Sequence, residues 1–265
     1  MAACIIAVLA SACDIGDAPD RDDGDGGEEL AGADPSPSGL PSASPSPTSG
    51  TPGDPSSGPK PRFAFPRAGT YVYAQEGFEE ICTPSCAGDP LPRKRTVTVG
   101  YARSSRDAIS TVEIARVSSH RTTTTVTRHR RALAAVVQVR DRFETRGSTF
   151  RIGFRPGPPI RALVLPLDAG AAWRGSWDAG TSGSYRIGVH GYDHIEVAGG
   201  RHRAARVQAR IEFGGDMEGH VVTTWWVDPR TRMVIASVGS MELRDGFGRY
   251  RTDFDTRLTR GPGYG

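Results

Sequence analysis

The sequence is short of the residues and motifs on which enzymes depend. Its six histidines are scattered, and it has no Gly-x-Ser-x-Gly nucleophile elbow, no Gly-x-x-x-x-Gly-Lys phosphate loop and no His-Glu-x-x-His zinc helix. Catalysis needs a nucleophile beside a base, paired carboxylates or a metal, and none of these arrangements is evident. We therefore expect a protein that is not an enzyme and that has no cofactor or metal site.

Asparagine is absent and lysine is nearly so, because Lys60 and Lys94 are the only lysines among 33 basic residues. Residues 14–59 contain ten acidic residues against Arg21 alone, whereas residues 60–265 contain 32 basic residues against 20 acidic ones. The later part of the chain is therefore basic by about twelve charges. Lys and Asn have AT-rich codons, so a GC-rich genome that encodes Arg at ordinary solvated positions is one explanation. A dedicated surface for anions is the other.

Long apolar runs are also missing, since the apolar stretch at residues 2–12 is too short to span a bilayer as a helix. It ends in Ala10-Ser11-Ala12, which is typical of a cleaved signal peptide, and Cys13 follows directly. This ending resembles the lipobox of bacterial lipoproteins of the actinobacterial type. The resemblance implies a signal peptide at residues 1–13, a fatty-acylated Cys13 and a lipid-anchored protein on the extracytoplasmic face of the cell membrane. An ordinary secretory signal is the alternative.

Residues 14–62 are rich in Asp, Gly, Pro and Ser, with Pro-Ser repeats at 35–38 and 45–47. Such a composition does not bury enough apolar surface to offset the entropy of the chain. It predicts a disordered, acidic linker that lifts the following domain off the membrane.

Two of the four cysteines, Cys82 and Cys86, flank a short segment that contains Pro84. In an exported domain with no other cysteines, this spacing predicts a disulfide. Two free thiols, or half of a metal site, are the alternatives. A metal site would need further ligands, and the chain has no second cysteine pair to supply them.

From Phe63 onward, apolar and polar residues alternate with a period of two, and Gly, Pro and Asp interrupt the alternation. This pattern predicts an all-β domain at residues 63–260, with a strongly curved antiparallel sheet or a half-open β-barrel, and a flexible tail at 261–265. Only residues 131–137 are a candidate for a short helix. The predicted strands are 70–75, 96–102, 111–117, 122–128, 136–144, 149–154, 184–189, 194–197, 204–213, 221–227, 233–243 and 250–258.

Local patterns refine three of these strands. The threonine run at residues 122–127 is β-branched but has no apolar face, which predicts an edge strand or an exposed one. Asp228-Pro229 predicts a hairpin turn, and in the strand before it Trp225 and Trp226 must point to opposite faces. The segment 190–194, with two histidines and Asp193, is a conceivable zinc site but is better explained as a polar hairpin turn.

The densest basic stretch would suit phospholipid headgroups or an anionic envelope polymer, and as a solvated edge it needs no partner. Nucleic acid is not expected, because no aromatic residues are interleaved with these arginines to form a stacking platform. The stretch comprises Arg121, Arg128, His129, Arg130, Arg131, Arg140 and Arg142.

Three features in order resemble a known family: Tyr71 and Tyr73 after Gly69, the segment 166–170 followed by Trp173 and Trp177, and the 224–229 hairpin. Over residues 63–258 this pattern resembles the unclosed β-barrel carriers of lipids and lipoproteins, the LolA and LppX type. The resemblance implies a curved sheet around an apolar cavity and a protein that binds or carries an apolar ligand such as a lipid. A non-catalytic interaction or structural module of the cell envelope, with a basic face, is the alternative. No ligand-binding residue carries over.

Overall fold

The computed structural model describes residues 63–82, 85–119, 121–145, 148–179, 181–215, 217–246 and 248–264. The predicted signal peptide, Cys13 and the linker at 14–62 lie outside these residues, so they remain predictions from the sequence. Among the described residues, no helix is long and apolar enough to cross a membrane.

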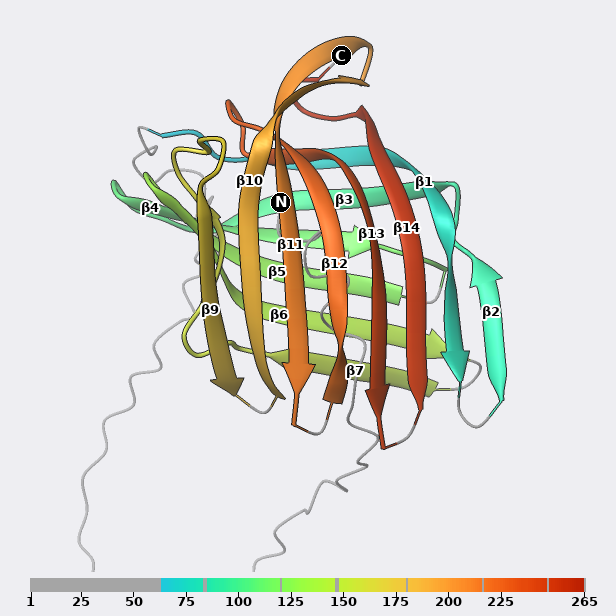
Figure 1. The fold of residues 1–265 in the computed structure, drawn as a ribbon. Helices are drawn as coiled ribbons and strands as arrows, with labels where there is room; N and C mark the ends of the chain where they lie inside the picture. The colour runs from blue at the N-terminus through green and yellow to red at the C-terminus, as the bar shows by residue number, and fades with distance from the viewer. Residues whose placement is uncertain are drawn as a thin grey trace, which may run out of the picture. The chain divides into compact units, whose positions relative to one another are not determined.

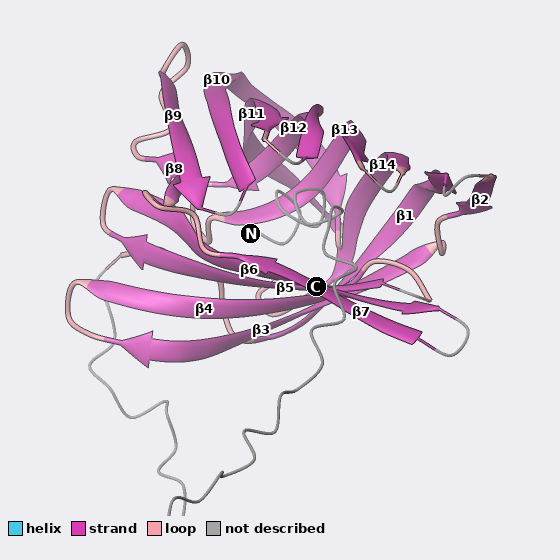
Figure 2. Cartoon of the chain, turned by 90° about the horizontal axis from the view of Figure 1, so that it is seen from below, coloured by secondary structure: helices cyan, strands magenta, loops and turns pink. Residues whose placement is uncertain are grey.

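Every regular element of the described chain is a β-strand, as Figure 2 shows, and all pairings are antiparallel. The predicted all-β fold class is confirmed. The strands are β1 (Gly69–Cys82), β2 (Cys86–Pro90), β3 (Lys94–Ser104), β4 (Ala108–Arg116), β5 (Arg121–Arg130), β6 (Leu133–Thr145), β7 (Ser148–Phe154), β8 (Ile160–Val164), β9 (Ala172–Ala179), β10 (Thr181–Val197), β11 (Gly200–Gly214), β12 (Met217–Asp228), β13 (Met233–Asp245) and β14 (Arg249–Arg260).

One continuous sheet is folded over on itself. Its order is β7-β6-β5-β4-β3-β1-β14-β13-β12-β11-β10-β9, with β2 paired to β1 and β8 paired to β6. Figure 1 shows β9 to β14 as a front layer, with β3 to β7 running across behind it. Strand β1 belongs to both layers, because residues 69–74 pair with β3 and residues 72–82 pair with β14. Side chains from the facing surfaces of the two layers fill the core.

The sheet closes almost completely and leaves one seam, between β8 and β9. Side chains bridge this seam: the Trp173 indole donates to the carbonyl of Arg161 at 2.7 Å, and the Arg161 guanidinium donates to the carbonyl of Arg174 at 2.6 Å. The backbone amide of Arg161 also donates to the Tyr185 hydroxyl at 3.2 Å. One backbone hydrogen bond, from the Asp178 amide to the Gly157 carbonyl at 3.3 Å, also links β9 to the segment before β8. The described strands therefore form a barrel with a single line of closure that depends mainly on side chains and has no backbone ladder.

Several local predictions need correction. The threonine run lies in β5, a central strand between β4 and β6, and not at an edge. Its odd-numbered members Thr123, Thr125 and Thr127 are buried. Residues 133–137 belong to β6 and form no helix. The segment 190–194 is not a turn, because β10 continues through it with a β-bulge at Val189/Gly191, where the positive φ of Gly191 (126°) accommodates the extra residue.

The predicted tail is packed where it is described. Gly261 and Tyr264 form an isolated β-bridge, and the Tyr264 ring is buried. Its hydroxyl donates to the Asp228 carboxylate at 2.9 Å, which fastens the end of β14 to the β12–β13 turn. This turn is the predicted hairpin: the Asp228 carboxylate accepts from the amide of Arg230, and its carbonyl accepts from the amide of Arg232.

Candidate functional site

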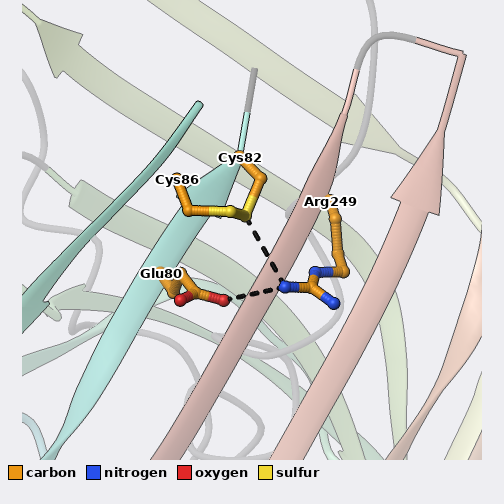
Figure 3. The surroundings of a disulfide bond; sticks show 4 residues. All are labelled: Glu80, Cys82, Cys86 and Arg249. Atoms are coloured by element: carbon orange, nitrogen blue, oxygen red, sulfur yellow. Dashed lines mark hydrogen bonds and ion pairs between the residues drawn. A yellow bond between two sulfur atoms is a disulfide. The ribbon is translucent and has the colours of Figure 1, made fainter. Parts of the chain in front are cut away.

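Cys82 and Cys86 form a disulfide across the β1–β2 hairpin, as the sequence predicted. Figure 3 shows that the Arg249 side chain from β14 reaches toward this hairpin. Its guanidinium donates to a Glu80 oxygen at 3.1 Å and lies 3.7 Å from the Cys82 sulfur. Glu80 and the two sulfurs are the only group in the described chain that has the spacing of metal ligands. Because the sulfurs are joined to each other, they are not thiolate ligands, and the arrangement acts as a covalent staple.

The zinc alternative at residues 190–194 is not assembled. Asp193 accepts a hydrogen bond from the Trp226 indole at 2.9 Å and pairs with the Arg206 guanidinium at 3.3 Å. This carboxylate therefore orients neighbours on the outer surface of β10 to β12. The contact also explains how Trp226 is accommodated when Trp225 points into the core, so the predicted opposite orientation of the two indoles is confirmed.

Several aromatic residues of the described sheet pack in the core. Trp177 and Phe213 meet edge to face, with ring centroids 5.6 Å apart, and Trp225 has no exposed surface. The Tyr73 hydroxyl donates to the carbonyl of Val234 at 2.9 Å, which joins β1 to β13 from inside. These rings therefore contribute to the free energy of folding through burial and through specific geometry.

The basic stretch is divided between the inside and the outside of the barrel. Strand β5 alternates strictly, so Arg121 and His129 point inward and are buried, whereas Arg128 and Arg130 point outward. The prediction that the basic stretch meets an anionic partner or solvent is therefore wrong for Arg121 and His129. The period-two alternation of side chains along a strand is the sequence signal that distinguishes these two buried residues from the exposed arginines of β5.

Inside, Arg121 forms a buried ion pair that links the two layers. Its guanidinium donates to one oxygen of Asp141 on β6 at 2.7 and 3.1 Å, and to the Tyr250 hydroxyl on β14 at 2.8 Å. Burial raises the pKa of Asp141 to about 6, against the opposing effects of Arg121 and of the Thr123 hydroxyl. Burial also lowers the pKa of His129 to about 3, so its imidazole is neutral at physiological pH and shares a hydrogen bond with Thr111 at 3.0 Å.

Outside, arginines collect on the rear layer. We define the basic face as the outward surface of β4, β5 and the described part of β6. Two carboxylates of these strands have described side chains, Glu113 and Asp141, and both point inward and are buried. Ile114 lies on the same outward surface and is 46% exposed. The arginines of the basic face are Arg116, Arg128, Arg130, Arg140 and Arg142, all exposed.

The arginines form two groups on this face. Arg116 and Arg142 flank Thr122 across three strands, and Arg140 lies beside Thr124 in the next outward row, which also contains Ile114. Arg128 and Arg130 lie toward the other end of β5. The basic face is therefore a broad β surface with apolar and hydroxyl-bearing side chains between its arginines.

The front layer has two hollows on its outer surface that the sequence did not indicate. One, of about 430 Å³, lies over β9 to β11 and is lined by Arg174, Arg186 and Arg210. The other, of about 540 Å³, lies over β1 and β12 to β14, with Val222 and Val238 in its lining. The first hollow is lined by three consecutive strands, whereas the second joins β1 to strands near the end of the chain. In both, the register of the strands brings the lining residues together.

No protein-family model matches the chain, and no curated protein sequence matches it. Among solved structures, the hypothetical lipoprotein YmcC from Escherichia coli (K12) matches with a TM-score of 0.32 and 14% sequence identity, over 68% of this chain and 85% of that chain. The resemblance to the LolA and LppX carriers therefore stays a prediction from the sequence.

Proposed function

We propose that this protein is a lipid-anchored, non-enzymatic module of the extracytoplasmic face of the cell membrane, and that its basic face binds bilayers containing anionic lipid. The observation that supports it best is the sorting of charge across the rear layer, with the arginines outside and both described carboxylates inside. Random use of Arg at solvated positions does not by itself place every described carboxylate of β4 to β6 on the inner surface.

The chemistry of the basic face suits a bilayer surface. An arginine near an anionic membrane contributes about 1 kcal/mol of binding, and its guanidinium forms paired hydrogen bonds with phosphate oxygens. Ile114 and its half-buried neighbours Val112 and Val126 supply apolar surface between the two arginine groups. An anchor at Cys13 would keep this face near the membrane, so a modest intrinsic affinity would be enough because tethering raises its effective concentration.

A vesicle-binding experiment tests the proposal. The full chain with Cys13→Ser, which removes the predicted acylation site, is mixed with vesicles of phosphatidylcholine alone or with phosphatidylglycerol added. We expect binding only to the anionic vesicles, and we expect R140A/R142A to weaken it about 30-fold, the equivalent of two arginine contacts. The binding should also weaken as salt is added, because the Debye length shrinks.

A matched control removes the same charge elsewhere. R251A/R257A deletes two front-layer arginines that lie beside Asp253 and Asp255, with nitrogen–oxygen distances of 3.6 and 3.9 Å. This control variant should bind vesicles within about twofold of the parent protein. Equal losses in the two double variants would show attraction by net charge alone and would overturn the assignment of the basic face, as would a preference for a soluble anionic polymer over the vesicles.

The second candidate is a carrier of an apolar ligand, and the β8–β9 seam favours it. Because side-chain hydrogen bonds bridge this line, the strands can part there without breaking a backbone ladder. Native mass spectrometry of the full chain tests this candidate: co-purified lipid would support it, and a ligand-free protein that takes up no added phospholipid would exclude it.

A further inference from the structure

Three arginines stand in register on the outer surface of the front layer. In β9, Arg174 is directly opposite Arg186 of β10, and Arg186 is directly opposite Arg210 of β11. All three are exposed and point to the same side of the sheet. Directly opposed residues of neighbouring strands have Cβ atoms about 5 Å apart, so this arginine row places three cations side by side.

Like charges in such positions destabilise a sheet unless something compensates them. Glu212 pairs with Arg210 on the same strand. Within the described part of the chain, Arg174 and Arg186 form no ion pair. The row and Glu212 together therefore carry a net charge of about two positive units that no described side chain neutralises. By contrast, Arg251 and Arg257 of β14 each have a nearby aspartate.

The residues beside the arginine row are small. Along β9 and β10, the next outward-pointing pair on one side of the row is Ser176 and Ser184. The next outward-pointing pair on the other side is Ala172 and Gly188. The long guanidinium side chains consequently border the hollow of about 430 Å³, with the two serines and Glu212 in its lining. This volume lies within the usual range for small-ligand sites, and serine hydroxyls add hydrogen-bond donors.

The backbone beneath the row is well supported. Trp173, Tyr185 and Ile187 of the same strands are buried on the inner side. Arg161 donates to the carbonyl of Arg174 across the seam and so links the outermost strand to β8. A site on paired strands with packed inner faces holds its ligating side chains at defined spacing.

We propose that this hollow binds a phosphate monoester through Arg174, Arg186 and Arg210, as a site separate from the basic face. A monoester carries about −1.5 to −2 charges at pH 7, which matches the net charge of the site, and its three terminal oxygens accept the paired hydrogen bonds that guanidinium groups donate. Binding removes the repulsion within the arginine row, so the free protein is less stable than the bound protein.

The experiment titrates the full chain bearing Cys13→Ser with glycerol phosphate in low salt, and measures affinity by calorimetry and stability by thermal unfolding. We expect binding that raises the unfolding midpoint. R186A should weaken binding at least tenfold, and without phosphate its midpoint should exceed that of the parent protein because the central like charge is gone. R186K keeps the positive charge but loses the planar guanidinium and its paired donors. Its affinity for glycerol phosphate should therefore lie between those of the parent protein and R186A.

R257A, an equal loss of charge on the same layer, is the control and should bind glycerol phosphate like the parent protein. R140A/R142A should also bind normally, which separates this site from the basic face and makes its failure distinguishable from that of the proposed function. The inference is overturned if the parent protein fails to bind millimolar glycerol phosphate, or if R186A and R257A bind it equally.

A second arm identifies the source of the monoester. Vesicles containing phosphatidic acid display a monoester headgroup, whereas phosphatidylglycerol is a diester. To reduce the contribution of the basic face, R140A/R142A serves as the parent protein for both kinds of vesicle. Binding to phosphatidic acid vesicles that R186A abolishes would assign a membrane headgroup. Binding of glycerol phosphate without binding of these vesicles would assign a soluble monoester, and either result supports the site.

Discussion

At the scale of single residues, the alternation of β5 decides which basic side chains meet water. Arg121 and His129 are at odd-numbered positions of the strand and are buried in the core. Arg128 and Arg130 are at even-numbered positions and are exposed. From composition alone, all four basic residues would be placed on the surface. A buried arginine is charged and needs an ion-pair partner, which Asp141 supplies for Arg121. The buried imidazole of His129 stays neutral and so avoids the free energy of desolvating a charge.

His129 gives a pH dependence to the free energy of unfolding. Its pKa is about 3 in the folded protein and 6.5 when unfolded, so the unfolded state takes up the proton first as pH falls. The stability that neutral His129 provides is complete above pH 6.5 and declines below it, by about 1.4 kcal/mol per pH unit. Asp141 acts oppositely between about pH 4 and 6, because its pKa is raised in the folded state.

The difference between the parent protein and His129→Gln isolates the histidine, since Asp141 is present in both. Urea unfolding of each protein between pH 7 and pH 4.5 should give a steeper loss of stability for the parent protein. Parallel curves would show that His129 is protonated at the same pH in the folded and unfolded states.

At the scale of elements, the alternation of apolar and polar residues predicted most of the strands. It did not predict where each strand ends or which strands pair with each other. Strands β2, β8 and β9 were missed because two are only five residues long and the third, AWRGSWDA, has Gly and Ala where bulky residues mark other strands. The bulge at Gly191 made one long strand look like two. The arginine row was not predictable, because sequence alone does not give the register that aligns Arg174, Arg186 and Arg210.

The β1–β2 hairpin depends on its disulfide. Strand β2 is exposed throughout and pairs only with β1 among the described strands, so little buried surface holds it. Closing a loop of about five residues contributes about 2 kcal/mol through the entropy of the unfolded chain. C82S/C86S should lose stability of this order in denaturant unfolding, and amide hydrogen exchange should quicken in residues 86–89 while β11 and β12 keep their protection.

A second variant, Arg249→Leu, tests the role of Arg249. If the disulfide is only a staple, Arg249→Leu with the cysteines intact should leave exchange in β2 close to that of the parent protein, because exposed ion pairs such as Arg249–Glu80 contribute little. Rapid exchange in Arg249→Leu would instead assign the hairpin's stability to the ion pair.

At the scale of the whole molecule, the predicted anchor and the basic face would act on the same membrane with different sensitivities. An acyl anchor is apolar and tolerates salt, whereas the attraction of arginines to anionic headgroups weakens as ionic strength rises. Cys13→Ala produced in a bacterial host that processes lipoproteins should therefore remain partly in the membrane fraction at low salt and leave it at high salt. The parent protein should stay in the membrane fraction under both conditions.

Combining Cys13→Ala with R140A/R142A should lower the membrane-bound fraction at low salt, because the predicted anchor is absent and the basic face binds about 30-fold more weakly. Combining it with R251A/R257A should not, since those arginines lie on the front layer beside aspartates. Sedimentation of membranes at two salt concentrations, followed by immunoblotting, distinguishes these cases. A Cys13→Ala protein that resists high salt would disprove the acylated cysteine as the anchor, because the remaining electrostatic contacts do not survive that treatment.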